Sequence, residues 1–136
     1  MKPLVTICIP TYNAASYIKE TLSSIRKQTY SNIEIIIGDN ASNDNTEQIV
    51  RAYIDAHKLG ISYYKNDENL GYSGNCNKLI NMANGEFVAI YHSDDVYNPN
   101  IVKEQVELLV GNEDLAGCFT RFNKIASNGV EQKNNF

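Results

Sequence analysis

The sequence predicts an α/β fold in which a mostly parallel sheet has helices on both faces. Short apolar runs rich in Ile and Val alternate along the chain with longer amphipathic segments. Strands that alternate with helices are joined by right-handed crossovers, which give parallel pairing and two helical layers. The 136 residues suffice for one hydrophobic core, so we expect a single domain over residues 1–136.

The chain begins with two predicted strands around one helix. Residues 4–9 are a β-branched run typical of a buried strand, which we expect Pro10 to close. Over residues 14–28 the apolar positions recur at helical spacing with charged residues between them, which predicts a surface helix. Residues 33–37 predict a second buried strand, which ends at the turn residues that follow.

A second helix and a weaker strand come next. Residues 45–57 predict a helix, with Ser42 or Asn43 as its N-cap. Residues 61–65 predict the third strand, which is rich in tyrosine.

The second half continues the alternation. We expect a polar loop over residues 66–74 and a helix over residues 75–83. Residues 86–91 predict a fourth strand, and residues 100–110 predict a helix that follows Pro99.

The end of the chain predicts one more strand, over residues 115–122. A hairpin turn is then expected at residues 127–130, before a polar tail.

Three polar clusters follow predicted strands, at residues 10–13, 39–44 and 92–95. Ligands of parallel α/β sheets bind at the carboxyl ends of the strands. The convergence of these clusters on one edge is the main functional signal in the sequence.

Asp94 and Asp95 end a buried strand and point to a hard cation. Carboxylates suit Mg²⁺ or Mn²⁺, which complete their coordination with diphosphate oxygens and water. The alternative is that the two aspartates cap the next helix or lie in a solvated loop. His92 is either a third ligand or a structural hydrogen-bonding residue.

The other polar clusters suit a nucleotide. Asp39 and Asn40 could meet a base edge, although the local sequence favours the alternative of a turn and helix cap. Tyr12 could stack on a base or be half-buried. Asn69 and Gly71 precede a helix, whose N-terminus favours phosphate.

Composition narrows the possible partners. The chain is 43% hydrophobic and 21% charged, and its net charge of −4 gives no field that would hold nucleic acid or an anionic membrane. No apolar run approaches the roughly 18 residues of a spanning helix, and we expect no signal peptide. Cys8, Cys76 and Cys118 lack CxxC spacing, so we expect reduced thiols and a cytoplasmic protein.

Several catalytic motifs are absent from the sequence. It has no G-x-G-x-x-G after the first strand, no G-x-x-x-x-G-K-[ST], no HExxH, no GxSxG and no Cys/His cluster with zinc spacing. These absences argue against a dinucleotide dehydrogenase and a P-loop ATPase.

In order and spacing, the motifs together resemble those of family 2 glycosyltransferases. The residues that carry the resemblance are Pro10-Thr11-Tyr12-Asn13, Asp39-Asn40-Ala41-Ser42-Asn43-Asp44, Asn69-Leu70-Gly71, Asn84-Gly85-Glu86-Phe87 and Ser93-Asp94-Asp95 with Pro99. The resemblance extends from residue 4 to residue 122. It implies the N-terminal, nucleotide-sugar-binding half of the GT-A fold.

The resemblance implies a donor, a metal and an acceptor. The donor would be a nucleoside-diphosphate sugar, preferably a UDP-sugar, held with divalent Mn²⁺ or Mg²⁺. The acceptor would be a cell-surface polysaccharide or glycolipid, and transfer would invert the anomeric centre. No nucleic acid is implied.

The resemblance also implies roles for individual residues. Asp95 would bind the metal, and Asp94 would face the ribose or sugar. The implied nucleotide-sugar-binding set is Pro10, Thr11, Tyr12 (against the base), Asp39 and Asn40 (at the base), Asn69, Gly71 and Asp94.

Three positions depart from the family pattern. Asn40 stands where an aspartate is common, which leaves the base open between UDP and dTDP sugars. Cys76 stands where many members have an arginine, so a basic contact to the nucleotide would be missing. His92 replaces the first acidic residue of the metal motif.

The catalytic base and most of the acceptor site of the family lie well after the metal motif, so we expect them beyond Phe136. Glu113 and Asp114 come too soon after Asp95 and predict a solvated loop. We therefore expect the 136 residues to bind donor weakly without transferring sugar. Missing sequence could also bring peripheral membrane association at the inner face of the membrane.

Two other function classes compete with the enzyme. One is a non-catalytic nucleotide-binding or interaction module on the same fold. The other, a nucleotidyltransferase, would need a Gly-rich, basic loop after the first strand, and residues 10–13 are neither.

Overall fold

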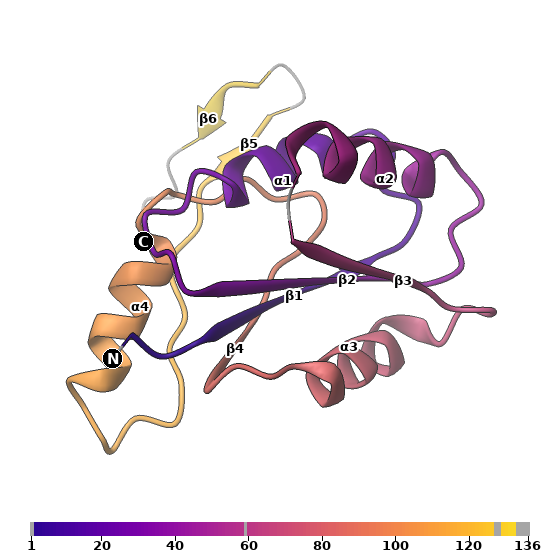
Figure 1. The fold of residues 1–136 in the computed structure, drawn as a ribbon. Coiled ribbons are helices and arrows are strands. Elements are labelled where there is room, and N and C mark those ends of the chain that lie inside the picture. Colours follow the sequence, from indigo (N-terminus) through magenta and orange to yellow (C-terminus); the bar gives the residue numbers. More distant parts are fainter. Residues whose placement is uncertain (1, 59, 127–128, 133–136) are drawn as a thin grey trace. The chain divides into compact units, whose positions relative to one another are not determined.

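The computed structural model describes residues 2–58, 60–126 and 129–132 (Figure 1). Its elements are β1 (Val5–Thr11), α1 (Ile18–Ile25), β2 (Ile33–Asp39), α2 (Thr46–His57), β3 (Ile61–Lys65), α3 (Gly71–Met82), β4 (Phe87–Ile90), α4 (Ile101–Val110), β5 (Lys124–Ile125) and β6 (Glu131–Gln132). The chain forms two compact units, residues 1–103 and residues 104–136. This division does not test the expected single domain, which stays a prediction.

The first unit is built on a parallel sheet. Among its described residues the strand order is β3-β2-β1-β4, and every neighbouring pair is parallel. β1 and β2 end together, because the register runs from Val5 opposite Ile33 to Thr11 opposite Asp39. Figure 1 shows α1 and α2 on one face of the sheet and α3 on the other. The predicted parallel sheet with helices on both faces is confirmed.

The core explains why most residues of β1 and β2 are apolar. Ile7, Ile9 and Ile37 are fully buried. The alternate positions Cys8 and Ile36 pack with Leu79 of α3. Successive side chains of a strand point to opposite faces, and both faces of β1 and β2 are covered by helices. An apolar residue is therefore favoured at nearly every position of these strands.

α3 approaches the sheet closely at Gly38 of β2. A Cβ atom at this position would lie 2.8 Å from Oδ1 of Asn75 and 2.9 Å from Cδ2 of Leu79. The side-chain amide of Asn75 donates to the carbonyl oxygen of Gly38 at 2.7 Å. Glycine therefore lets the first turns of α3 bind directly to the backbone of β2.

The first strand and first helix differ from the sequence prediction at their ends. Pro10 does not close β1, because the strand runs on to Thr11, whose carbonyl accepts the N–H of Asn40 at 2.8 Å. Proline is tolerated here because β4 pairs with β1 only as far as Cys8, so position 10 lies beyond the end of that pairing. α1 is shorter than the predicted 14–28 and has turns at both ends.

The predicted N-cap of α2 is wrong. Neither Ser42 nor Asn43 caps the helix; instead Oδ1 of Asp44 accepts the N–H of Thr46 at 3.0 Å. Ser42 has another role, because its hydroxyl accepts the N–H of Asn13 at 2.9 Å. The serine therefore joins two loops rather than ending one helix.

α3 begins at Gly71, earlier than the predicted residue 75. The glycines of this segment indicate a loop when the sequence is taken alone. Oδ1 of Asn69 accepts the N–H of Gly71 at 2.8 Å, and Oδ1 of Asn40 accepts the N–H of Leu70 at 2.9 Å. These side chains satisfy donors that a helix start leaves free, so the helix extends over the glycines.

The predicted strand over residues 115–122 is wrong. In the second unit, β5 pairs with β6 in an antiparallel ribbon, and residues 115–122 form no strand. Phe119 is 95% exposed. Strand propensity needs a paired neighbour and a surface to pack on, and the described ribbon provides neither for this run. The predicted turn falls between β5 and β6, but Ser127 and Asn128 lie outside the described residues.

Two further observations concern cysteines and membranes. Cys8 and Cys76 are buried, Cys118 is partly buried, and all three are free thiols, as predicted. Burial raises the pKa of the Cys8 thiol to about 11, with smaller contributions from Glu34 and Cys76. Within the described residues, the helices lack the length and apolar character needed to cross a bilayer.

Candidate functional site

A pocket of about 410 Å³ lies in the first unit, where the loops after β1, β2 and β4 meet the start of α3. It is lined by Pro10, Thr11, Tyr12, Asn40, Asn69, Gly71, Tyr72, Asn75, His92, Ser93 and Asp94. The site predicted from the strand ends is therefore a cavity formed by separate segments. Asp39 and Asp95 belong to the predicted set but do not line it.

The loop after β1 is clamped to the loop after β2. The N–H of Asn13 donates to the Ser42 hydroxyl at 2.9 Å, and the N–H of Asn43 donates to Oδ1 of Asn13 at 3.0 Å. Asn13 has a φ of 49°, a left-handed conformation that asparagine tolerates. This turn leaves the ring of Tyr12 49% exposed at the pocket.

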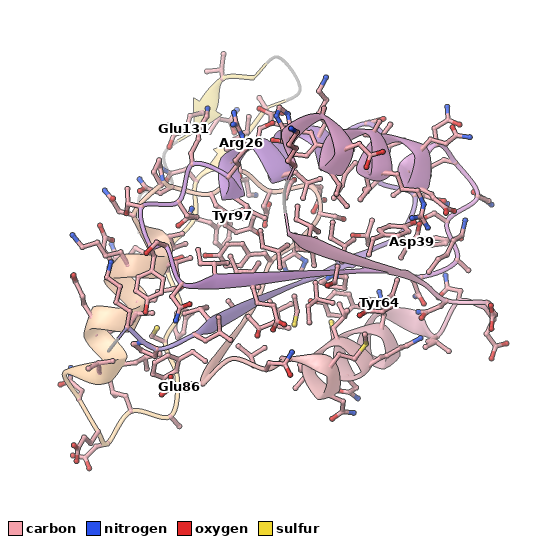
Figure 2. The ribbon with its side chains drawn as sticks, in the orientation of Figure 1. Arg26, Asp39, Tyr64, Glu86, Tyr97 and Glu131 are labelled. Atoms are coloured by element: carbon pink, nitrogen blue, oxygen red, sulfur yellow. The ribbon has the colours of Figure 1, made fainter. Side chains whose placement is uncertain are left out.

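Asp39 is fully buried, and both of its carboxylate oxygens have partners. Oδ1 accepts the N–H of Ser42 at 2.7 Å, and Oδ2 accepts the hydroxyl of Tyr63. Figure 2 shows Asp39 at the carboxyl end of β2. Burial and then the contact with Asp39 raise the pKa of the Tyr63 hydroxyl. Asp39 therefore orders the β2–α2 loop without lining the pocket itself.

Asn40 is 4% exposed and uses its whole side-chain amide within the protein. Nδ2 donates to Oδ1 of Asn69 at 2.7 Å and to the carbonyl of Gly71 at 3.2 Å. Oδ1 accepts from Nδ2 of Asn66 at 3.1 Å and from the N–H of Leu70 at 2.9 Å. A side-chain amide has two donor hydrogens and two acceptor lone pairs. The four bonds of Asn40 therefore use its whole hydrogen-bonding capacity.

The asparagine network continues beneath α3. Nδ2 of Asn66 also donates to Oδ1 of Asn75 at 3.2 Å, and the ammonium of Lys78 donates to Oδ1 of Asn66 at 2.7 Å. The sequence analysis missed Asn66, Asn75 and Lys78. Their signal was the richness in asparagine, which predicts turns but carries no information on long-range partners.

The loop after β4 is fixed by Tyr97 and α1. The N–H of His92 donates to Oη of Tyr97 at 2.6 Å, and the Tyr97 ring stacks on Tyr91 with centroids 3.8 Å apart. The N–H of Tyr97 donates to the hydroxyl of Ser24, and the hydroxyl of Thr21 donates to the carbonyl of Ser93. Burial is the main cause of the raised pKa of Tyr97.

The ring of His92 stacks on the ring of Tyr72. Tyr72 is another site residue that the sequence analysis missed. The two rings are 6° from parallel with centroids 5.7 Å apart. Tyr72 belongs to the first turn of α3 and His92 to the loop after β4, and both line the pocket. The only sequence signal for Tyr72 was its position next to Gly71.

Asp94 and Asp95 are both exposed at the end of β4. In the part of the chain that the structure describes, no group of three or more His, Cys, Asp or Glu side chains could hold a metal. Mg²⁺ and Mn²⁺ usually take one or two carboxylates from the protein and complete their coordination with phosphate oxygens and water. The residues present fit a cation that arrives with a diphosphate, because the exposed Asp94 lines the pocket, the exposed Asp95 follows it directly, and the pocket volume is in the usual range for small-molecule sites.

No Lys or Arg is among the residues that line the pocket. Lys78 is outside the lining, and its ammonium donates to Asn66. The pocket lining therefore consists mainly of asparagine, hydroxyl and aromatic side chains, with Asp94 as its one acidic residue.

The chain resembles known proteins over almost its whole length. A sequence profile described as Glycosyl transferase family 2 matches residues 6–135. An uncharacterized glycosyltransferase of Methanocaldococcus jannaschii is 35% identical over 130 residues, which are 94% of this chain and 44% of the relative. An Escherichia coli protein named UDP-Glc:alpha-D-GlcNAc-diphosphoundecaprenol beta-1,3-glucosyltransferase is 32% identical, over 96% of this chain and 50% of the relative.

A solved structure shares the fold. The mannosyltransferase PcManGT of Pyrobaculum calidifontis, in complex with GDP-Man and Mn²⁺, superposes with a TM-score of 0.76 at 31% identity. The match covers 80% of this chain and 33% of that protein. The chain thus spans between a third and a half of the length of these three proteins.

Proposed function

The chain belongs to glycosyl transferase family 2 and has the GT-A fold, and on this premise we propose that its first unit binds the nucleotide-sugar donor of a metal-dependent, inverting glycosyltransferase. One observation carries the proposal. Residues from separate segments, each predicted from its motif to hold the donor, line a single pocket. They are Pro10, Thr11, Tyr12, Asn40, Asn69, Gly71 and Asp94.

We propose a UDP-sugar as donor, with dTDP-sugars as the nearest competitor. The E. coli relative is named for UDP-Glc, and the Pyrobaculum enzyme was solved with GDP-Man, so nucleoside-diphosphate sugars are the shared chemistry. In our proposal the base lies against Tyr12, and the ribose or sugar lies toward Asp94. Asp39 supports the site through its loop, since its carboxylate is buried and occupied.

Asp95 is the residue that we propose for the metal. A divalent cation there would neutralise the diphosphate and stabilise the departing nucleoside diphosphate. This role would explain how a pocket without Lys or Arg in its lining holds an anionic donor. Asp94 then remains available for the hydroxyl groups of the donor.

We propose a saccharide or lipid-linked acceptor of the cell envelope. Support comes from the E. coli relative, whose name specifies a diphosphoundecaprenol-linked acceptor. In transfer with inversion, a base removes the proton of an acceptor hydroxyl, whose oxygen attacks the anomeric carbon. We assign that base to no residue of this chain and expect it outside the 136 residues. Cytoplasmic location likewise stays a prediction.

The proposal is tested by calorimetric titrations of UDP and of UDP-glucose into the wild type, Asp94→Ala and Asp67→Ala in the presence of Mg²⁺. Asp67 is an exposed loop residue outside the pocket lining and is the matched control. We expect Asp94→Ala to weaken UDP or UDP-glucose binding about tenfold, the typical effect of a lost charge-assisted hydrogen bond. Absence of binding by the wild type, or equal affinities for all three proteins, would overturn the proposal.

A further inference from the structure

We propose that Tyr72, held in place by His92, is a second stacking surface for the donor base, on the side of the pocket opposite Tyr12. The inference rests on the proposed function, because it assumes that the pocket takes a nucleotide. Neither Tyr72 nor His92 had such a role in the sequence analysis.

The exposure of the Tyr72–His92 pair indicates that it serves a ligand. The rings are 6° from parallel, yet Tyr72 is 56% exposed and His92 is also exposed. Aromatic pairs that build a core bury their rings, whereas this pair is exposed and lines the pocket. A flat aromatic wall at a ligand pocket is suited to a second flat ring.

The Tyr72 ring is positioned by its neighbours. Cys76 lies one turn later on the same face of α3. Burial and then the nearby Cys76 thiol raise the pKa of the Tyr72 hydroxyl. Since His92 is in turn fixed through its N–H to Tyr97, the ring is held before any ligand arrives. A preorganised surface loses little entropy on binding.

Two of the three departures from the family pattern are neighbours of Tyr72. Cys76 lies one turn after it on α3, and the His92 ring stacks on it. At position 76 a small thiol takes the place of a long basic side chain. At position 92 an imidazole takes the place of a carboxylate and provides a ring that can stack.

The position of Tyr72 complements that of Tyr12. Tyr12 precedes α1, whereas Tyr72 lies at the start of α3, and Figure 1 shows these helices on opposite faces of the sheet. Both tyrosines line the same pocket. A base bound at the sheet edge between the two layers can be contacted on both faces. Stacking on an aromatic side chain contributes about 1–3 kcal/mol per base.

A single introduced tryptophan tests this placement. The chain contains no tryptophan, so Tyr72→Trp gives a protein with one indole. We expect UDP with Mg²⁺ to quench its fluorescence saturably, and pyrophosphate with Mg²⁺, which has no base, to leave it unchanged. Tyr17→Trp is the control, because Tyr17 is 57% exposed and outside the pocket lining. A UDP response equal in the two variants would overturn the inference.

Affinity measurements give an independent test. We expect Tyr72→Ala to weaken UDP binding about tenfold and Tyr72→Phe to stay within about twofold of the wild type. His92→Ala should weaken binding less, and His92→Phe, which keeps a ring, should restore it. Because both side chains are exposed, thermal melting should show folded proteins.

The failures of the two proposals are distinguishable. If the wild type does not bind UDP, the proposed function fails. If the wild type binds UDP and Tyr72→Ala binds it equally well, the proposed function stands and the stacking role of Tyr72 is wrong. An effect of Tyr72→Ala on UDP-glucose but not on UDP would also contradict stacking on the base.

Discussion

The side-chain amide of Asn40 donates to the side-chain oxygen of Asn69 across 2.7 Å, joining the end of β2 to the start of α3. The same oxygen of Asn69 accepts the N–H of Gly71 at 2.8 Å. Asn69 therefore cannot turn its amide over without losing both of these bonds. The pair fixes the loop on which Gly71 and Tyr72 enter the pocket.

Asn40→Asp is expected to destabilise the protein and weaken UDP binding. A carboxylate would lose both N–H donors and face two acceptors, Oδ1 of Asn69 and the carbonyl of Gly71. Buried groups left without partners cost about 1–3 kcal/mol each. We expect a loss of at least about 2 kcal/mol in the free energy of unfolding, measured by urea denaturation.

The control for this substitution is Asn77→Asp, at an exposed position of α3. It makes the same chemical change and should alter the free energy of unfolding by less than about 0.5 kcal/mol. An Asn40→Asp protein as stable as this control would contradict the role of the amide network.

Gly38→Ala is expected to lower stability because α3 packs directly on the backbone there. The new Cβ would lie 2.8 Å from Oδ1 of Asn75, so the helix must shift or its bond to β2 must lengthen. Overpacking of this kind costs about 1–3 kcal/mol. Thermal and urea unfolding of Gly60→Ala is the comparison, since a Cβ at Gly60 meets nothing within 4 Å. Equal stability of the two variants would show that the close approach is not needed.

Stability should fall on acidification, in part through Glu34. Burial opposes ionisation of Glu34, but hydrogen bonds from the Thr6 hydroxyl and from Asn84 outweigh it and lower the pKa below its usual 4.5. A carboxyl whose pKa is lower in the folded state stabilises the fold above about pH 4.5. That contribution is lost as the pH falls through the lowered pKa.

Urea unfolding between pH 3 and pH 6 measures this contribution. Glu34→Gln should flatten the pH dependence, although not abolish it, because the pKa values of Asp44 and Glu47 are also lowered. Thr6→Val, which removes the donor hydroxyl, should flatten it too, whereas Thr6→Ser should not. A Glu34→Gln curve parallel to that of the wild type would rule out this assignment.

Tyr97→Phe is expected to loosen the loop that carries His92, Ser93 and Asp94. The substitution keeps the ring stacked on Tyr91 but removes the oxygen that accepts the N–H of His92. We expect a loss of about 1 kcal/mol in unfolding free energy and weaker UDP binding. The exposed Tyr17→Phe should change neither quantity. If UDP affinity is unaffected in Tyr97→Phe, the loop does not depend on this bond.

The parallel sheet could be predicted from sequence because its central strands, β1 and β2, are covered on both faces. The run over residues 33–37 is apolar except at Glu34, and the order of such runs with the helices predicts the parallel topology. The site edge followed from the same logic, since polar clusters after parallel strands must meet. Most of the predicted donor-binding residues do line the pocket.

What could not be predicted depends on contacts between distant residues. Ser42 and Asp39 look like local cap residues, yet Ser42 binds Asn13 and Asp39 binds Tyr63. The start of α3 depends on Asn40, which lies on another strand end. The segment containing Phe119 has strand composition but no strand partner in the described structure. Local structural propensity does not predict any of these long-range contacts.

The most direct test of the central claim is calorimetric titration of UDP into the wild type, Asp95→Ala and the control Asp67→Ala, with and without Mn²⁺. Parallel titrations with dTDP show which base is preferred. We predict saturable UDP binding that Mn²⁺ tightens at least about tenfold in the wild type and in Asp67→Ala, with that gain absent in Asp95→Ala. UDP binding that is independent of Mn²⁺ and unchanged in Asp95→Ala would contradict the metal-assisted donor site.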